Sequence, residues 1–185
     1  NWQINNQYGN PMSSLMVDLN NDDYDDLVFW NFDNRQFWSD ADEGYILLSN
    51  GSADIQSWKK VSLPTGPFGE NKNKYNHAAS EDFNNDGFKD VVVAVTRDDP
   101  YYEGAYIQVL INDGTGKLFD ETSSRFPNQF RADKHHGEGN IYVRDMNNDS
   151  YIDIIHSTRD YESGYHGSHI AINDGYGNFI SLENA

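Results

Sequence analysis

Asp82-Phe83-Asn84-Asn85-Asp86-Gly87-Phe88-Lys89-Asp90 is a stretch in which oxygen-bearing side chains recur at every second position before a final carboxylate. A hard cation such as Ca²⁺ takes about 6 to 8 oxygen ligands. A tightly wound loop can supply them from its positions 1, 3 and 5, from the backbone carbonyl of position 7 and from a closing carboxylate. The stretch therefore predicts a calcium loop whose ligands are Asp82, Asn84, Asp86, the carbonyl of Phe88, and Asp90.

The same pattern occurs at residues 18–26 and 145–153, at intervals of 64 and 63 residues. The predicted ligands there are Asp18, Asn20, Asp22, the carbonyl of Tyr24 and Asp26, and then Asp145, Asn147, Asp149, the carbonyl of Tyr151 and Asp153. A fixed period indicates structural repeats, so we expect three Ca²⁺ sites, one per repeat. The alternative is a set of Asx-rich turns without metal, although turn chemistry does not explain three such patterns in register.

Short runs rich in β-forming residues flank each loop and are too short to be helices. The expected strands are 14–17, 27–30, 45–48 and 58–63 in the first repeat, 78–81, 91–96, 106–111 and 118–122 in the second, and 140–144, 154–158, 169–172 and 179–182 in the third. No segment shows helical periodicity, so we expect an all-β chain. Strands on both sides separate these loops from the EF-hand, whose loop lies between helices.

Four antiparallel strands per repeat, with an apolar second strand, are typical of the blade of a β-propeller, where each sheet stacks between two neighbours. We expect about three blades. Residues 1–12 would be a strand and connection from a preceding blade, 13–63 blade 1, 64–124 blade 2 with its leading connection, and 125–185 blade 3 with its leading connection. Closed propellers have roughly four to eight blades, so we expect a partial propeller. It is either a segment of a larger one or a subunit that self-associates through open blade edges. A start at Asn1 without a signal peptide favours a processed or excised piece.

The motif DxNxDGxxD, followed by a strand and then by NDGxGxF, resembles the FG-GAP/VCBS repeat. Residues 112–119 and 173–179 carry the second part of the motif, whereas residues 49–55 of the first repeat have SNGSADI instead. The resemblance covers nearly the whole chain. It implies a propeller like that of integrin α subunits, bacterial surface proteins and some fungal lectins, acting as a module for adhesion or for carbohydrate or glycoprotein binding.

Position 6 of the loops departs from this pattern in two of the three copies. Gly87 occupies it in the second loop, but Asp23 and Ser150 occupy it in the first and third. The sharp turn there favours glycine, which adopts a positive φ freely, and aspartate tolerates that backbone better than serine does. We therefore expect the third loop to bind calcium most weakly.

The composition limits the compartment and the partners. The formal charge is −17, from 30 acidic and 13 basic residues, which disfavours nucleic acid and anionic membrane surfaces as partners. The longest aliphatic run, residues 91–95, is far shorter than the roughly 20 residues that span a bilayer, so we expect no membrane insertion. Cysteine is absent, which excludes disulfides. Calcium loops of modest affinity stay filled outside cells, so we expect a secreted, extracellular or cell-surface protein.

A ligand-binding surface is expected at the end of the blades opposite the calcium loops, where the resemblance places the loops between second and third strands and the connections between blades. Eight of the 13 basic residues are assigned there: Arg35, Arg97, Arg159, Lys72, Lys74, Arg125, Arg131 and Lys134. Aromatic rings with cationic and amide edges suit a sugar, so we expect a glycan or glycosylated protein as partner. The candidate ligand-binding residues are Trp38, Arg97, Tyr101, Tyr102, Lys134, His135, His136, Arg159 and Tyr165. The alternative is that these are polar loop tips whose aromatic side chains pack onto the blades.

Two other functions stay open beside the binding module. The first is a structural subunit that assembles through its open blade edges into an oligomer or filament. The second is the propeller of a polysaccharide-processing enzyme, with loop residues such as His136 and Tyr165 in its site. The sequence has no GxSxG, HExxH or phosphate-loop motif, and its most regularly placed carboxylates are assigned to calcium. We therefore expect no enzymatic activity.

Overall fold

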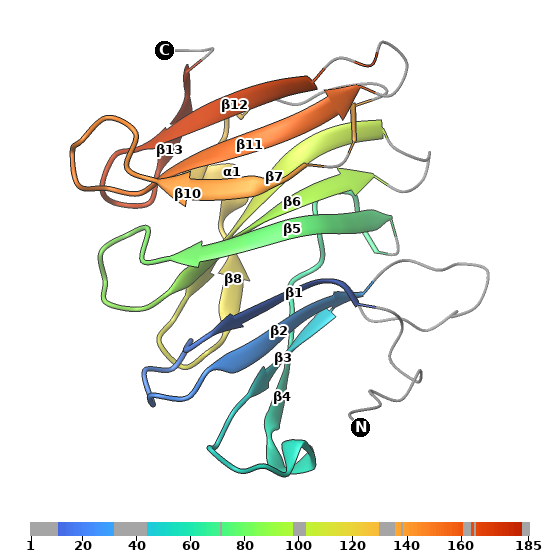
Figure 1. Ribbon diagram of the computed structural model, residues 1–185, viewed down its shortest axis with the longest axis vertical. Helices are drawn as coiled ribbons and strands as arrows, with labels where there is room; N and C mark the ends of the chain where they lie inside the picture. The colour runs from blue at the N-terminus through green and yellow to red at the C-terminus, as the bar shows by residue number, and fades with distance from the viewer. Residues whose placement is uncertain are drawn as a thin grey trace.

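The structure, a computed structural model, describes residues 11–31, 44–70, 72–97, 103–129, 136–137, 139–160, 164 and 166–182 of the 185-residue chain. Within them the chain forms three antiparallel sheets that stack on one another (Figure 1). Among the described residues, helix is limited to two short turns. The prediction of an all-β fold made of blade-like, four-stranded sheets is confirmed, and the sheets are called blades 1, 2 and 3 below.

Each blade is a meander in which consecutive strands pair. Blade 1 contains β1 (Pro11–Val17), β2 (Asp26–Asn31), β3 (Gly44–Leu48) and β4 (Lys59–Ser62); blade 2 contains β5 (Asn73–Glu81), β6 (Asp90–Arg97), β7 (Glu103–Asn112) and β8 (Leu118–Asp120); blade 3 contains β10 (Ile141–Arg144), β11 (Asp153–Asp160), β12 (His166–Asn173) and β13 (Phe179–Ser181). The two-residue strand β9 (His136–Gly137) adds to blade 3 by pairing with the end of β11. The strand expected before blade 1 lies outside the described residues.

The second strand of blade 2 shows why the sheets stack. Along β6, Val91, Val93 and Val95 belong to one apolar cluster, while Val92 and Ala94 belong to another. Successive side chains of a strand point to opposite faces, so a strand that is apolar at every position needs cover on both sides. Blade 2 is therefore a central sheet between two neighbours.

Aromatic contacts mark the two interfaces between blades. Trp30 of blade 1 packs against Tyr75 of blade 2, with ring centroids 6.2 Å apart. On the other side of blade 2, Phe83 meets Phe179 of blade 3 edge-on, with centroids 5.6 Å apart. Buried pairs of this geometry contribute about 0.5–1.5 kcal/mol beyond the area they bury.

Two helical turns lie next to the predicted strands. The strand expected at residues 118–122 ends at Asp120, because Asp120 Oδ1 accepts hydrogen bonds from both the backbone N–H and the hydroxyl of Thr122. A single turn of helix, α1 (Thr122–Arg125), follows. In blade 1 a 3₁₀ turn, η2 (Ile55–Ser57), lies in the connection between β3 and β4. Local side-chain bonds of this kind compete with strand pairing and carry no periodic signal.

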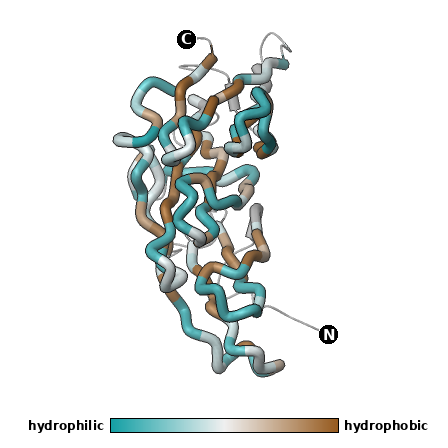
Figure 2. The backbone as a smooth tube through the Cα atoms, turned by 90° about the vertical axis from the view of Figure 1, so that its left-hand side faces the viewer, coloured by the Kyte–Doolittle hydropathy of each residue, from teal (hydrophilic) through white to brown (hydrophobic). Residues whose placement is uncertain are grey.

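The loops between first and second strands all emerge at one edge of the stack, at the left of Figure 1, together with the turns between third and fourth strands. This edge is called the loop edge. Figure 2 views it directly, and its loops are mainly hydrophilic. In the part of the chain that the structure describes, no helix is long and apolar enough to cross a membrane.

Candidate metal centre

Each of the three loops is wound around the carboxylate of its first residue. In loop 2 (residues 82–90), Asp82 Oδ1 accepts the backbone N–H of Asp86 at 3.0 Å and Asp82 Oδ2 accepts that of Gly87 at 2.9 Å. The same two bonds recur from Asp22 and Asp23 to Asp18 in loop 1, and from Asp149 and Ser150 to Asp145 in loop 3. The sequence repeat is thus a repeat of conformation.

The middle of the loop is held by positions 3 and 5. Asp86 Oδ1 accepts the backbone N–H of Phe88 at 2.9 Å, and Asn84 Nδ2 donates to Asp86 Oδ2 at 2.9 Å. Equivalent bonds occur in loops 1 and 3. These bonds turn the side chains of alternate residues to one side of the backbone, as the alternating pattern predicts.

The closing aspartate ties each loop to the turn after the third strand. Asp90 is fully buried and accepts backbone N–H groups from Phe83 at 3.2 Å and from Asn112 at 2.9 Å. Burial raises the pKa of Asp90 to about 7, and the charges of Asp86 and Asp82 add to this effect against the two hydrogen bonds. Asp26 of loop 1 is buried likewise, and burial also raises its pKa. Without a cation, the protein therefore disfavours the charged form of these two closing carboxylates.

The backbone of each loop enters the left-handed region twice. Position 6 has φ of +68° at Asp23, +91° at Gly87 and +75° at Ser150. Position 4, an asparagine in every loop, has φ between +55° and +62°. Asparagine tolerates this region and serine does not, so loop 3 holds strain at Ser150 that loop 2 avoids with glycine.

The loops offer the oxygen-only ligand set that Ca²⁺ prefers. One observation tests the fit directly: Asn20 Oδ1, at position 3 of loop 1, is buried and has no hydrogen-bond partner. A buried acceptor without a donor costs about 1–3 kcal/mol, and a bound cation would remove that cost. Among the described residues, His, Asp and Glu side chains nowhere form a group of three or more that could hold a metal ion by themselves. A calcium site here would therefore also need the asparagine and the position 7 carbonyl of each loop.

An aromatic ring at position 7 covers a glycine of the following turn in every blade. A Cβ on Gly51 would lie 2.6 Å from the ring of Tyr24, and one on Gly114 would lie 2.7 Å from that of Phe88. Tyr151 and Gly175 repeat the contact in blade 3. The contact fixes the position of the loop relative to the turn. This contact was not predicted from the sequence, although the aromatic residue at position 7 of all three loops was the available signal.

Asparagine side chains at the loop edge also connect neighbouring blades. Asn112 Nδ2 of blade 2 donates to Leu19 O of blade 1 at 2.7 Å. Asn173 Nδ2 of blade 3 donates to Phe83 O of blade 2 at 2.9 Å. The sequence analysis treated these asparagines only as part of a turn motif, because a bond between residues about 90 positions apart leaves no local pattern.

Most of the candidate ligand-binding residues lie outside the described residues, namely Trp38, Tyr101, Tyr102, Lys134, His135 and Tyr165. For His136 and Arg159 the backbone is described: β9 pairs with β11, so the two residues lie on adjacent strands at the edge opposite the loops. Arg97 ends β6 at the same edge, with its guanidinium carbon 5.7 Å from the centre of the Phe68 ring.

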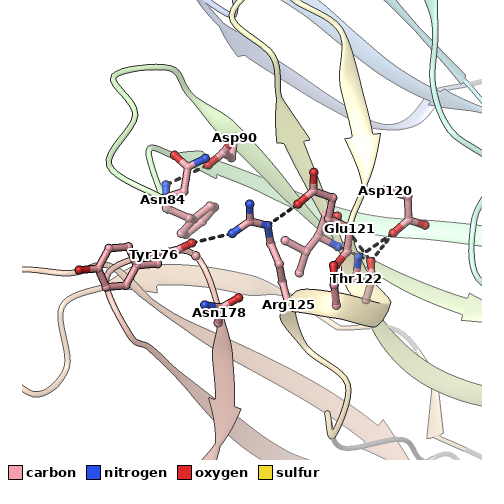
Figure 3. Close-up of polar contacts among 12 residues, drawn as sticks. Asn84, Asp90, Asp120, Glu121, Thr122, Arg125, Tyr176 and Asn178 are labelled. Atoms are coloured by element: carbon pink, nitrogen blue, oxygen red, sulfur yellow. Dashed lines mark hydrogen bonds and ion pairs between the residues drawn. The ribbon is translucent and has the colours of Figure 1, made fainter.

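Two basic residues do not lie where the sequence analysis placed them. Lys74 is a buried residue within β5, not part of a connection. Arg125 lies at the loop edge, where its Nη1 donates to Tyr176 O at 2.6 Å and its Nε pairs with Glu121 at 2.7 Å, next to Asn84 (Figure 3). The turn of helix at α1 directs Arg125 toward the loop edge, so the assignment of eight cations to the opposite edge is wrong.

Comparison with protein families gives a match that covers the centre of the chain. Residues 82–156 match the model of the FG-GAP-like repeat. The match begins at the first aspartate of loop 2 and ends in β11, so it includes loops 2 and 3. No curated protein and no solved structure matches the chain. The chain therefore carries an FG-GAP-like repeat, consistent with the FG-GAP/VCBS repeat family.

Proposed function

We propose that this protein is an extracellular calcium-binding module that binds a glycan or a glycosylated protein in adhesion. FG-GAP-like repeats typically occur in extracellular or surface proteins, which supports the adhesion-type role. The observation that carries the proposal is the threefold repeat of an oxygen-lined loop at one edge of the stacked blades, with a buried, unsatisfied acceptor at Asn20. The oxygen ligands of the loop edge would bind a stabilising ion. The opposite edge of the blades would then be the surface that binds a partner.

Calcium would stabilise the fold and would take no part in a reaction. Loop 1 would hold it with Asp18, Asn20, Asp22, the carbonyl of Tyr24 and Asp26; loop 2 with Asp82, Asn84, Asp86, the carbonyl of Phe88 and Asp90; loop 3 with Asp145, Asn147, Asp149, the carbonyl of Tyr151 and Asp153. The ion would supply positive charge to carboxylates that otherwise repel one another. The closing aspartates of loops 2 and 3 bond Asn112 and Asn173, whose side chains bond the preceding blade, so this charge would also stabilise the blade interfaces at the loop edge.

The partner would bind at the edge opposite the loops. Two observations support this placement: β9 pairs His136 with Asp160, the residue after Arg159, and Arg97 ends β6 of the adjacent blade. Arginine gives charge-assisted hydrogen bonds to an anionic sugar, and aromatic residues of the same segments, such as Tyr101 and Tyr102, offer stacking surfaces. A salt-sensitive signal would indicate an acidic glycan, because contacts near solvent are screened.

A glycan array tests the proposal, with the wild type and a Tyr101→Ala/Tyr102→Ala variant probed in calcium. The matched control is Tyr176→Ala, which removes an exposed tyrosine at the loop edge. We expect a specific signal from the wild type and the control, and a loss of at least about tenfold in the double variant, as expected for stacking contacts. A wild type that binds no glycan in calcium, while circular dichroism shows it folded, would reject the ligand class.

A further inference from the structure

The interface between neighbouring blades has a direction. The blade that follows in the chain supplies an asparagine, and the blade that precedes it supplies the backbone carbonyl of loop position 2. Asn112 bonds Leu19 O in this way, and Asn173 bonds Phe83 O. In the opposite direction, the asparagine at position 4 of the preceding loop donates to the following blade, from Asn21 to Gly87 O and from Asn85 to Gly175 O. The two sides of each interface therefore differ. The preceding half is the loop side of the blade that comes first in the chain, and the following half is the turn side of the blade that comes next.

The apolar side chain at loop position 2 belongs to the preceding half. Leu19 in loop 1 and Phe83 in loop 2 are both 0% exposed. Leu19 lies in the cluster between blades 1 and 2, and Phe83 in the cluster between blades 2 and 3. Burial at this position therefore depends on the blade that follows.

Blade 3 carries a complete preceding half that no described residue covers. Met146, at loop position 2, is 42% exposed. Ile155 and Ile172 are half-buried, whereas the matching Val92 and Ile111 of blade 2 are buried. Asn148 stands at position 4, and among the described residues none accepts a hydrogen bond from its side chain. These four residues define the outer face of blade 3.

Blade 1 lacks the following half. Ser49 occupies the place of Asn112: its N–H donates to Asp26 Oδ1 at 2.7 Å, as that of Asn112 donates to Asp90 Oδ1. Its hydroxyl accepts the N–H of Gly51, so the turn is kept. A serine side chain has no amide to reach a carbonyl of another blade.

The second turn glycine is also replaced in blade 1. A Cβ on Gly116 would collide with Leu48 of blade 1, and one on Gly177 would lie 3.2 Å from Asn84 of blade 2. Both glycines therefore permit close approach to the preceding blade. Blade 1 has Ala53 at the matching place in its sequence, and Ala53 is exposed. Two independent positions of blade 1 thus lack the features by which blades 2 and 3 contact the blade before them.

We propose that the outer face of blade 3 binds one further FG-GAP-like blade, other than the three described here, whose turn carries Asn-Asp-Gly-x-Gly. The side-chain amide of that asparagine donates a hydrogen bond to Met146 O. The same blade accepts a hydrogen bond from Asn148 and covers Met146, Ile155 and Ile172. Blade 1 of a second copy binds this position more weakly, because Ser49 lacks the required amide and Ala53 the required clearance. The assembly is therefore directional and grows from blade 3. This inference does not rest on calcium or glycan binding.

Completing the missing half on blade 1 tests the proposal. The Ser49→Asn/Ala53→Gly variant makes blade 1 resemble a following blade, so a second copy can dock on blade 3. We expect sedimentation velocity to show a wild-type monomer and a head-to-tail series for the variant, with an association constant at least about tenfold higher, the order of one buried hydrogen bond. The matched control is Ser123→Asn, which adds an asparagine at an exposed site away from this turn.

A second substitution locates the contact. Adding Met146→Glu to the double variant places a charge on the outer face and is expected to restore the monomer. Hydrogen exchange of the variant oligomer should show new protection at residues 146–148 and 49–53. A folded double variant that stays monomeric overturns the proposal. A wild-type oligomer abolished by Met146→Glu also overturns it, because a second copy would then occupy the face without the asparagine.

Discussion

Blades 2 and 3 carry nearly the same loop and turn, yet the two blades differ in what covers them. Blade 2 lies between two sheets, and its loop position 2, Phe83, is completely buried. Blade 3 has a described neighbour on one side, and its position 2, Met146, is 42% exposed. The bonds that Gly87 and Phe88 make in loop 2 nevertheless recur at Ser150 and Tyr151 in loop 3. Loop conformation is therefore local, whereas burial of the loop depends on the adjacent blade.

This difference separates two sources of stability. Carboxylates, asparagines and backbone N–H groups within about ten residues of one another wind each loop. The interfaces depend instead on residues distant in sequence, such as Phe83 and Phe179. Calcium should act mainly on the first source and core substitutions on the second, which allows the two to be tested separately.

Removing calcium is expected to have the largest effect, because it acts on all three loops at once. Each site filled at about 100 times its Kd adds about 2.7 kcal/mol. At about 2–4 °C per kcal/mol for a chain of this size, EGTA should lower the Tm by about 10 °C or more. Differential scanning calorimetry of protein verified as metal-free by elemental analysis checks this, with readdition of Ca²⁺ and of Mg²⁺ as controls. An unchanged melt would contradict calcium binding.

The burial difference at loop position 2 predicts unequal costs for the same substitution. Phe83→Ala removes a fully buried ring that packs on Phe179, so it should lower the free energy of unfolding by about 3–5 kcal/mol. Met146→Ala removes an exposed side chain and should cost less than about 1 kcal/mol. Urea unfolding in saturating calcium measures both. Equal costs would mean that the outer face of blade 3 is already covered.

Blade 3 differs from blade 2 in its core as well, because His156 occupies the place of Val93. Burial, with a contribution from His169, lowers the pKa of His156 to about 4. The folded chain then keeps this imidazole neutral while the unfolded chain takes up a proton below about pH 6.5. Stability from this group is complete above pH 6.5 and is lost as the pH falls toward 4, by roughly 2–3 kcal/mol.

The matched variant His156→Val gives blade 3 the residue of blade 2. Its free energy of unfolding in saturating calcium should fall less steeply between pH 6.5 and 4 than that of the wild type. The comparison of the two slopes removes the contribution of the loop carboxylates, which both proteins share. Parallel slopes would show that His156 is protonated in the folded state or is not buried.

The smallest expected effect concerns strain at loop position 6. Ser150→Gly in loop 3 allows the φ of +75° without a Cβ and should stabilise the calcium-bound protein by about 1 kcal/mol, with tighter calcium binding by loop 3. Gly87→Ser in loop 2 should have the opposite effect. Isothermal titration with calcium checks both variants. Tighter binding by Gly87→Ser would contradict the ranking of the loops.

Local features of this protein follow from its sequence. The alternation of oxygen side chains from Asp82 to Asp90 predicts a wound loop, and the apolar run of residues 91–95 predicts a strand covered on both faces. The period of about 63 residues predicts repeated four-stranded sheets, and the match at residues 82–156 agrees with it. These features depend on residues within one blade, so a single repeat contains the information.

Contacts between blades were decided only by the tertiary structure. The bond from Asn173 to Phe83 O, the position of Arg125 beside Asn84 and the exposure of Met146 all involve residues far apart in sequence. A periodic pattern shows that a side chain is apolar or can donate a hydrogen bond, but not which neighbour receives it. The sequence by itself determined the conformation of each loop, because short-range bonds wind it. The stacking of sheets decided which loops are covered and which face stays open, because a side chain at an interface is buried only when two adjacent blades are in contact.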